Sequence, residues 1–359
     1  MVLGNHPISV MQPNQRNQVT ERLDYFDVLR ALAIFAVVAI HSSGSGLQLS
    51  EESMGFNLTV LWRNILNFAV PMFLAISGFF LAKKTIGTYG DYVAFLRKQI
   101  PRVYVPFFIW SLVWLAFAVL IQDKSVVHEI IKLATFQSSG PYYFIALIIQ
   151  YYLLLPVLKK FANAKGLAIS MLVSMAMTFW IFYLRYHTEI SLPLILYAGN
   201  FATWQMFFVL GLCLGTSQKI RVSSKYLLAL ILIFYILSCI ESYVLIGAFH
   251  QAGDAVTAVK ASSFMYSFFL IVFLSKNRDL IKSKLLKEIG VMSFGIYLTH
   301  MFALMVISRM LSRLHSPLQG TAYAYQLFLA GLVTLSCFLC ISVFNRVFSD
   351  RQARFLGFK

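Results

Sequence analysis

The residues best suited to chemistry lie in the first apolar segment, where a charged side chain is costly unless it has a role. Asp27 and Arg30 are three positions apart, so on a helix they share a face and can form an ion pair. Arg30 and His41 are eleven positions apart, which is three turns plus roughly 20°, with about 16 Å between them along the axis. An imidazole transfers protons near neutral pH, and a guanidinium binds phosphate. The spacing predicts one polar stripe, with a guanidinium near the cytoplasmic face and an imidazole well into the outer half of the membrane.

A purely structural interpretation of this stripe has about equal weight from the residues alone. In it, Arg30 extends to the inner headgroups and His41 makes a hydrogen bond that only holds helices together.

A second group of interest is the cation cluster Arg97, Lys98 and Arg102, just before the third apolar segment. Such a cluster is most often an ordinary anchor on the cytoplasmic side of a membrane. The functional alternative is a seat for an anionic phosphate group arriving from the cytoplasm.

Further polar side chains occur within apolar segments, where each can serve as a hydrogen bond between helices. Two of them, Glu241 and His300, are the most costly to bury and therefore the most suggestive of function. Cys337 and Cys340 form a CxxC pair without other His or Cys nearby in the sequence, so we predict no metal site. The candidate supporting residues are Ser77, Tyr143, Gln150, Tyr151, Glu241 and His300.

The elements that must position these residues are membrane helices. The chain has 359 residues, of which 59% are hydrophobic and only 12% charged, whereas soluble domains carry about 25% charged residues. The net charge of +16 does not indicate nucleic-acid binding, because the cations lie in short clusters between apolar runs. We predict an all-α polytopic integral membrane protein with about ten transmembrane helices. The predicted segments are 26–43, 60–82, 103–121, 142–158, 167–184, 201–215, 226–248, 256–274, 290–310 and 323–348.

The distribution of basic residues predicts the orientation. With the N-terminus inside, most of the 30 Lys and Arg residues fall on the cytoplasmic side, which favours an even number of helices and two cytoplasmic termini. We expect a flexible cytoplasmic tail over residues 1–22, a transmembrane domain over 23–350 and a cytoplasmic C-terminal tail over 351–359. The outer set is Arg63, Lys124, Lys132, Arg185, Lys260, Arg309 and Arg313.

Four stretches together resemble acyltransferase family 3, the integral-membrane acyltransferases of bacterial surface polysaccharides. The most specific is the segment from Asp27 to His41, which fits the family's Arg-x10-His pattern. One departure is Gln99, which stands where the family often has the first Arg of an Arg-x-x-Arg pair. The other three stretches are 70–79, 143–156 with 207–211 further on, and 293–300.

The resemblance implies an enzyme of the bacterial cytoplasmic (inner) membrane. Its co-substrate would be acyl-CoA, most simply acetyl-CoA, with no other cofactor. Its acceptor would be a hydroxyl of a surface polysaccharide or of a lipid-linked glycan, and polysaccharide-assembly proteins would be further partners. The acyl group and the acceptor polymer both remain open.

The resemblance also implies roles for the candidate residues. His41 would be the general base that activates the acceptor hydroxyl, or a transient carrier of the acyl group. Arg30 and the Arg97, Lys98 and Arg102 cluster would hold the phosphates of CoA, and Asp27 would orient Arg30. Ser77, Tyr143, Gln150 and His300 would line the channel or polarise the thioester carbonyl.

Two functions without chemistry compete with this interpretation. Helices with interior charges and with interrupting Gly and Pro residues also suit a transporter or exporter of a glycan or its precursor. A passive assembly factor is the third alternative, and the buried ionisable residues argue against it.

Overall fold

The computed structural model describes residues 13–188, 192–216, 222–313 and 322–359. Residues 1–12 of the predicted tail lie outside the described residues. Residues 13–22 form the first turns of helix α1, Pro13–Ser42.

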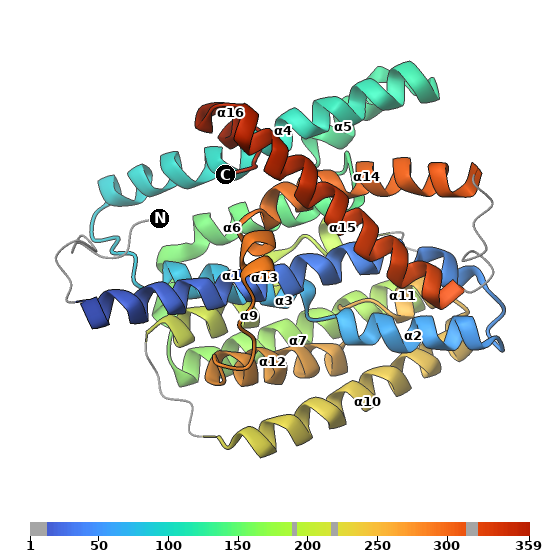
Figure 1. The fold of residues 1–359 in the computed structure, drawn as a ribbon. Coiled ribbons are helices and arrows are strands. Elements are labelled where there is room, and N and C mark those ends of the chain that lie inside the picture. The colour runs from blue at the N-terminus through green and yellow to red at the C-terminus, as the bar shows by residue number, and fades with distance from the viewer. Residues whose placement is uncertain (1–12, 189–191, 217–221, 314–321) are drawn as a thin grey trace.

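The described residues form helices and loops without a strand, as predicted (Figure 1). The chain belongs to the all-α membrane proteins, in which every backbone group of a spanning segment is satisfied within its own helix. The α-helices after α1 are α2 Met54–Leu66, α3 Ala69–Leu81, α4 Tyr89–Gln122, α5 Val126–Ala134, α6 Tyr143–Leu158, α7 Ala164–His187, α8 Leu194–Tyr197, α9 Phe201–Gly215, α10 Ser224–Phe249, α11 Ala252–Ala255, α12 Ala261–Lys276, α13 Lys284–Val291, α14 Ser293–Arg313, α15 Ala322–Val347 and α16 Asp350–Phe355. The 3-10 turns are η2 Gly44–Gln48, η3 Gly140–Tyr142 and η4 Lys159–Phe161.

Each predicted segment overlaps a helix, but the predicted count of about ten spanning helices is not confirmed. Eight helical stretches of the described chain are long and apolar enough to cross a membrane, and α9 and α12 are shorter apolar helices. With 15 and 16 residues, they reach only about 22–24 Å, less than the ~30 Å of the hydrocarbon layer. The predicted segment 256–274 is wrong at its start, because α12 begins only at Ala261.

The segment predicted as one helix over 60–82 is divided into α2 and α3. Asn67 and Phe68 form a turn between them. Asn67 is almost fully buried, and its side chain donates to backbone and side-chain oxygens from the region of α12. A polar side chain that bonds away from its own helix favours an interruption of this kind.

Helix α1 lies in the middle of the molecule and packs against α3, α13, α14 and α15 (Figure 1). Small residues allow the inner helices to approach closely, as is usual in membranes. An added Cβ at Gly211 of α9 would lie 2.0 Å from the backbone oxygen of Ala75 in α3. The result is a rigid inner layer around α1, α3 and α9.

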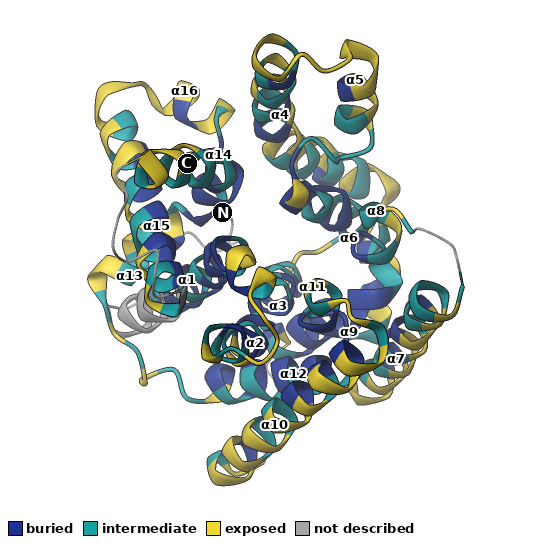
Figure 2. Cartoon of the chain, turned by 90° about the vertical axis from the view of Figure 1, so that its right-hand side faces the viewer, coloured by how far each residue is buried: buried dark blue, intermediate teal, exposed yellow. Residues whose placement is uncertain are grey.

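The outer helices α4, α7 and α10 carry many exposed positions, which are yellow in Figure 2, and many of these residues are large and apolar. Leu172 and Phe179 of α7 and Leu232 and Val244 of α10 are more than half exposed. A patch of this extent is abnormal on a soluble protein, but it matches a surface that faces lipid. The chain is therefore a multi-pass membrane protein.

Candidate active site

A cavity of about 480 Å³ opens between α1, α3, α6 and the non-helical backbone before α9 and α12. Ala198 lines it before α9, and residues 256–259 line it before α12. Non-helical backbone within a membrane is tolerated where it lines a cavity. The two short helices therefore begin late because the preceding chain builds the cavity wall.

Helix α1 places both Arg30 and His41 on this cavity. The expected ion pair between Asp27 and Arg30 is present, with Arg30 Nη1 2.6 Å from Asp27 Oδ1. The guanidinium also lies over the Phe80 ring, 4.9 Å from its centroid. Helix α13 packs tightly beside this pair, because a Cβ at Gly290 would lie 1.7 Å from the Asp27 carbonyl oxygen.

At the other end of the stripe, His41 meets His300 of α14. The two ring centroids are 5.5 Å apart, and His300 is fully buried. The Nδ1 atom of His300 lies 2.8 Å from the Tyr297 carbonyl oxygen and 3.2 Å from that of Ile296. Because carbonyl oxygens only accept, Nδ1 carries the proton and Nε2 of the neutral ring is an acceptor. This Nε2 is buried and has no hydrogen-bond partner among the described residues.

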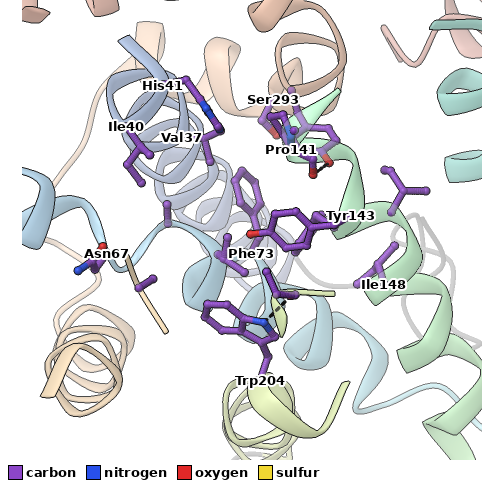
Figure 3. A pocket seen from close by; sticks show the side chains of 18 of the residues that line it. Val37, Ile40, His41, Asn67, Phe73, Pro141, Tyr143, Ile148, Trp204 and Ser293 are labelled. Atoms are coloured by element: carbon purple, nitrogen blue, oxygen red, sulfur yellow. Dashed lines mark hydrogen bonds between the residues drawn. The ribbon is translucent and has the colours of Figure 1, made fainter. Parts of the chain in front are cut away.

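Tyr143 and Ser77 also line the cavity. The hydroxyl of Tyr143 points from the start of α6 toward the middle of the cavity, and His41 lies across from it (Figure 3). Ser77 donates to the Phe73 carbonyl oxygen at 2.9 Å, which leaves its hydroxyl oxygen able to accept. The Arg30 guanidinium, the His41 imidazole and the Tyr143 phenol thus face one largely apolar space, as needed to bind an anion at one end and move a proton at the other. His300 stands behind His41 and does not itself line the cavity.

A family model described as an acyltransferase domain, that of acyltransferase family 3, matches residues 23–344. The chain belongs to this family. It is therefore a membrane acyltransferase, an enzyme that transfers acyl groups. The searches of curated proteins and of solved structures found no match.

The cation cluster of this acyltransferase does not line the cavity. Arg97, Lys98 and Arg102 are exposed on α4, although Val103, the next residue, does line it. The cluster lies at the Arg30 end, because both Arg102 and Arg30 are close enough to the Tyr152 hydroxyl to interact with it electrostatically. These three side chains can therefore contact a ligand only outside the cavity, at its Arg30 end.

Three of the supporting residues make structural hydrogen bonds away from the cavity. Gln150 donates to the Gly199 carbonyl oxygen at 2.7 Å and accepts from the Phe201 backbone N–H at 3.2 Å. Tyr151 donates to the Phe201 carbonyl oxygen at 2.7 Å and stacks on Phe208. Glu241 accepts from the backbone N–H and hydroxyl of Ser262. The first two fix the start of α9 against α6, and Glu241 joins α10 to α12.

Several lining residues of the acyltransferase were not predicted as site residues. Tyr152, Tyr197 and Trp204 face the cavity, and the Trp204 indole N–H donates to the Ala198 carbonyl oxygen at 2.8 Å (Figure 3). Arg63 and Asn67 also line it. The available signals are a cation and an amide within the apolar run of the second segment, but the distribution of basic residues accounts for Arg63 as a member of the outer set.

A buried polar network supports the wall formed by residues 256–259. Lys260 is fully buried, and its ammonium donates to Asn64 Oδ1 at 2.9 Å, to the Ser238 carbonyl oxygen at 3.0 Å and to the Ser242 hydroxyl. Asn67 donates to the Thr257 carbonyl oxygen at 3.3 Å. All three ammonium protons thus find acceptors, which is the condition for burying such a charge. The network ties the wall to α2 and α10.

Among the described residues, no group of three or more His, Cys, Asp or Glu side chains is placed to hold a metal ion.

Proposed function

We propose that this acyltransferase moves an acyl group, most simply acetyl, from acyl-CoA on the cytoplasmic side to a hydroxyl of a surface polysaccharide or lipid-linked glycan. The observation that carries the proposal is that Arg30 and His41 line one cavity, since a guanidinium can bind an anion and an imidazole can accept a proton. A pantetheine arm is long enough to extend over the ~16 Å that eleven helical residues span. The protein would lie in the bacterial inner membrane with both termini in the cytoplasm.

In this proposal Arg30, oriented by Asp27, binds a CoA phosphate through charge-assisted hydrogen bonds. Arg97, Lys98 and Arg102 attract the nucleotide from the cytoplasm, since they are exposed beside the same end of the cavity. Polysaccharide-assembly proteins would supply or receive the acceptor.

His41 accepts the proton of the attacking hydroxyl, for which its imidazole must be neutral. No Asp or Glu is among the described residues that line the cavity, so no carboxylate there keeps the ring charged. His300 lies beside it with a free acceptor nitrogen and can hold the His41 ring in place. The alternative in which His41 carries the acyl group itself uses the same position.

The test is the ester content of surface glycans in the native host. A deletion strain is complemented with the wild-type gene, with His41→Ala or with His128→Ala, a control in the exposed face of α5. Mild alkali releases ester-linked acyl groups for mass spectrometry. We expect one ester to be absent from the deletion and His41→Ala strains, with the amount of glycan unchanged and the control normal.

Unchanged esters together with less surface glycan would contradict the proposal and favour an exporter. If the ester is lost in the deletion strain but complete in the His41→Ala strain, the protein transfers acyl groups, and the role proposed for His41 is wrong.

A further inference from the structure

The cavity contains a second guanidinium, that of Arg63 in α2, which the proposed function leaves unused. Arg30 has a carboxylate partner, Asp27, whereas Arg63 has no ion pair within the described residues. No Asp or Glu is among the described residues that line the cavity. The Arg63 end of the cavity is therefore electropositive and lacks a counter-charge.

One hydrogen bond fixes Arg63 beside the candidate base. Its Nη1 donates to the carbonyl oxygen of Ile40 at 3.1 Å, and Ile40 directly precedes His41. Arg63 and His41 both line the cavity. A guanidinium carries five N–H donors. The single bond to Ile40 therefore leaves donors of Arg63 for a ligand that is bound in the cavity beside His41.

We propose that Arg63 is a catalytic residue that binds the negative charge developing on the thioester carbonyl oxygen. This inference rests on the proposed function. The acceptor hydroxyl oxygen forms a bond to the carbonyl carbon, its proton passes to His41, and the carbonyl electron pair moves onto oxygen. When the carbon–sulfur bond breaks, the pair returns to form the ester carbonyl, and the departing CoA thiolate takes the proton from His41.

The position of Arg63 distinguishes this role from binding of the CoA phosphates. Arg30 is eleven residues from His41 along α1, and the proposed function gives it the phosphate role. Arg63 contacts the residue next to His41. Fixed donors aimed at a developing oxyanion in a site of low dielectric are among the strongest contributions to catalysis. Arg63 lies in the last turn of α2, inside the apolar stretch Met54–Leu81, and a cation within such a stretch of a membrane protein is generally retained for function.

The test compares Arg63→Gln with the wild type and with Arg309→Gln. Arg309 is an exposed arginine of the apolar helix α14 that does not line the cavity. Inverted membrane vesicles of the native host, which hold the endogenous acceptor, receive radiolabelled acetyl-CoA, and alkali-labile label in the glycan and lipid fractions is counted. Binding of acetyl-CoA to the purified proteins is measured separately by calorimetry.

We expect Arg63→Gln to bind acetyl-CoA as the wild type does and to transfer acetyl about 100-fold more slowly, while Arg309→Gln transfers normally. Transfer within threefold of wild type, or a loss fully explained by weaker acetyl-CoA binding, would overturn the inference. If Arg63→Gln does not accumulate in the membrane, Arg63→Lys replaces it. Lys retains the charge but lacks the fork of donors, and we then expect about tenfold slower transfer, with a wild-type rate overturning the inference.

A wild-type protein that transfers no label from acetyl-CoA would contradict the proposed function itself. That result is distinct from an active wild type whose Arg63 variants are equally active.

Discussion

At the scale of single residues, the site consists of groups whose partners determine what they can do. Arg30 is held by Asp27, and the His300 ring has its tautomer fixed by the carbonyl oxygens of Ile296 and Tyr297. His41 has the cavity on one side and the His300 ring on the other. The proposed roles follow from this arrangement: the Arg30 end of the cavity binds the phosphates of CoA, and the His41 end accepts the proton of the acceptor hydroxyl.

His300 is expected to act through His41 as a positioning residue. His300→Ala removes the neighbour that restrains the His41 ring, and a displacement of about 1 Å at a reacting group can cost about 100-fold in rate. We therefore expect acetyl transfer in vesicles to fall by about that factor while acetyl-CoA binding is unchanged. His128→Ala serves as the control, and a wild-type rate for His300→Ala would show that the His41 ring needs no such support.

The sequence predicts part of this site for a clear reason. Arg30 and His41 lie on one helix, so their spacing alone places them on one face. The cost of burial and the stretch 293–300 make His300 a candidate, but neither predicts its contact with His41, which depends on the packing of α14 against α1. Gln150 and Tyr151 satisfy backbone groups at the start of α9, and no local pattern separates that use from a place in the cavity.

At the scale of elements, the cavity depends on helices that are interrupted or begin late. The turn at Asn67 divides α2 from α3, and the chain before α12 is held by Lys260 and its partners. A hydropathy pattern cannot show these features, since residues 60–82 and 256–274 are as apolar as unbroken helices. They arise from tertiary hydrogen bonds between residues distant in the sequence.

The contact between α1 and α13 provides a prediction at this scale. At Gly290, an added methyl group would overlap the Asp27 carbonyl oxygen, so Gly290→Ala should move α13 away from α1 and destabilise the protein by about 1–3 kcal/mol. At Gly331 of α15 an added Cβ meets nothing within 4 Å, and Gly331→Ala should be neutral or stabilising by up to ~1 kcal/mol. Thermal unfolding in detergent measures both. A midpoint for Gly290→Ala at or above that of Gly331→Ala would contradict the packing argument.

At the scale of the whole molecule, the outer faces of α4, α7 and α10 are apolar, and the few polar groups of the site lie in an inner cavity that is itself largely apolar. Composition predicts the membrane and the all-α class directly, because the low content of charge cannot cover a soluble surface. The number of spanning helices does not follow in the same way, since α9 and α12 are apolar but short. The cavity beside them is lined by both Arg30 and His41, and in the proposed function the acyl group passes through it.

The central claim is that Arg30 binds the donor and His41 acts on the acceptor within one cavity. The most direct measurement is the rate of acetyl transfer in inverted vesicles as acetyl-CoA is raised to saturation, for wild type, Arg30→Gln and His41→Ala. We predict that Arg30→Gln needs at least about tenfold more acetyl-CoA, because a charge-assisted hydrogen bond is lost, but approaches the wild-type rate at saturation. His41→Ala should saturate at the wild-type concentration with a rate at least about 100-fold lower. A wild-type maximal rate for His41→Ala, or an unchanged acetyl-CoA requirement for Arg30→Gln, would contradict the account.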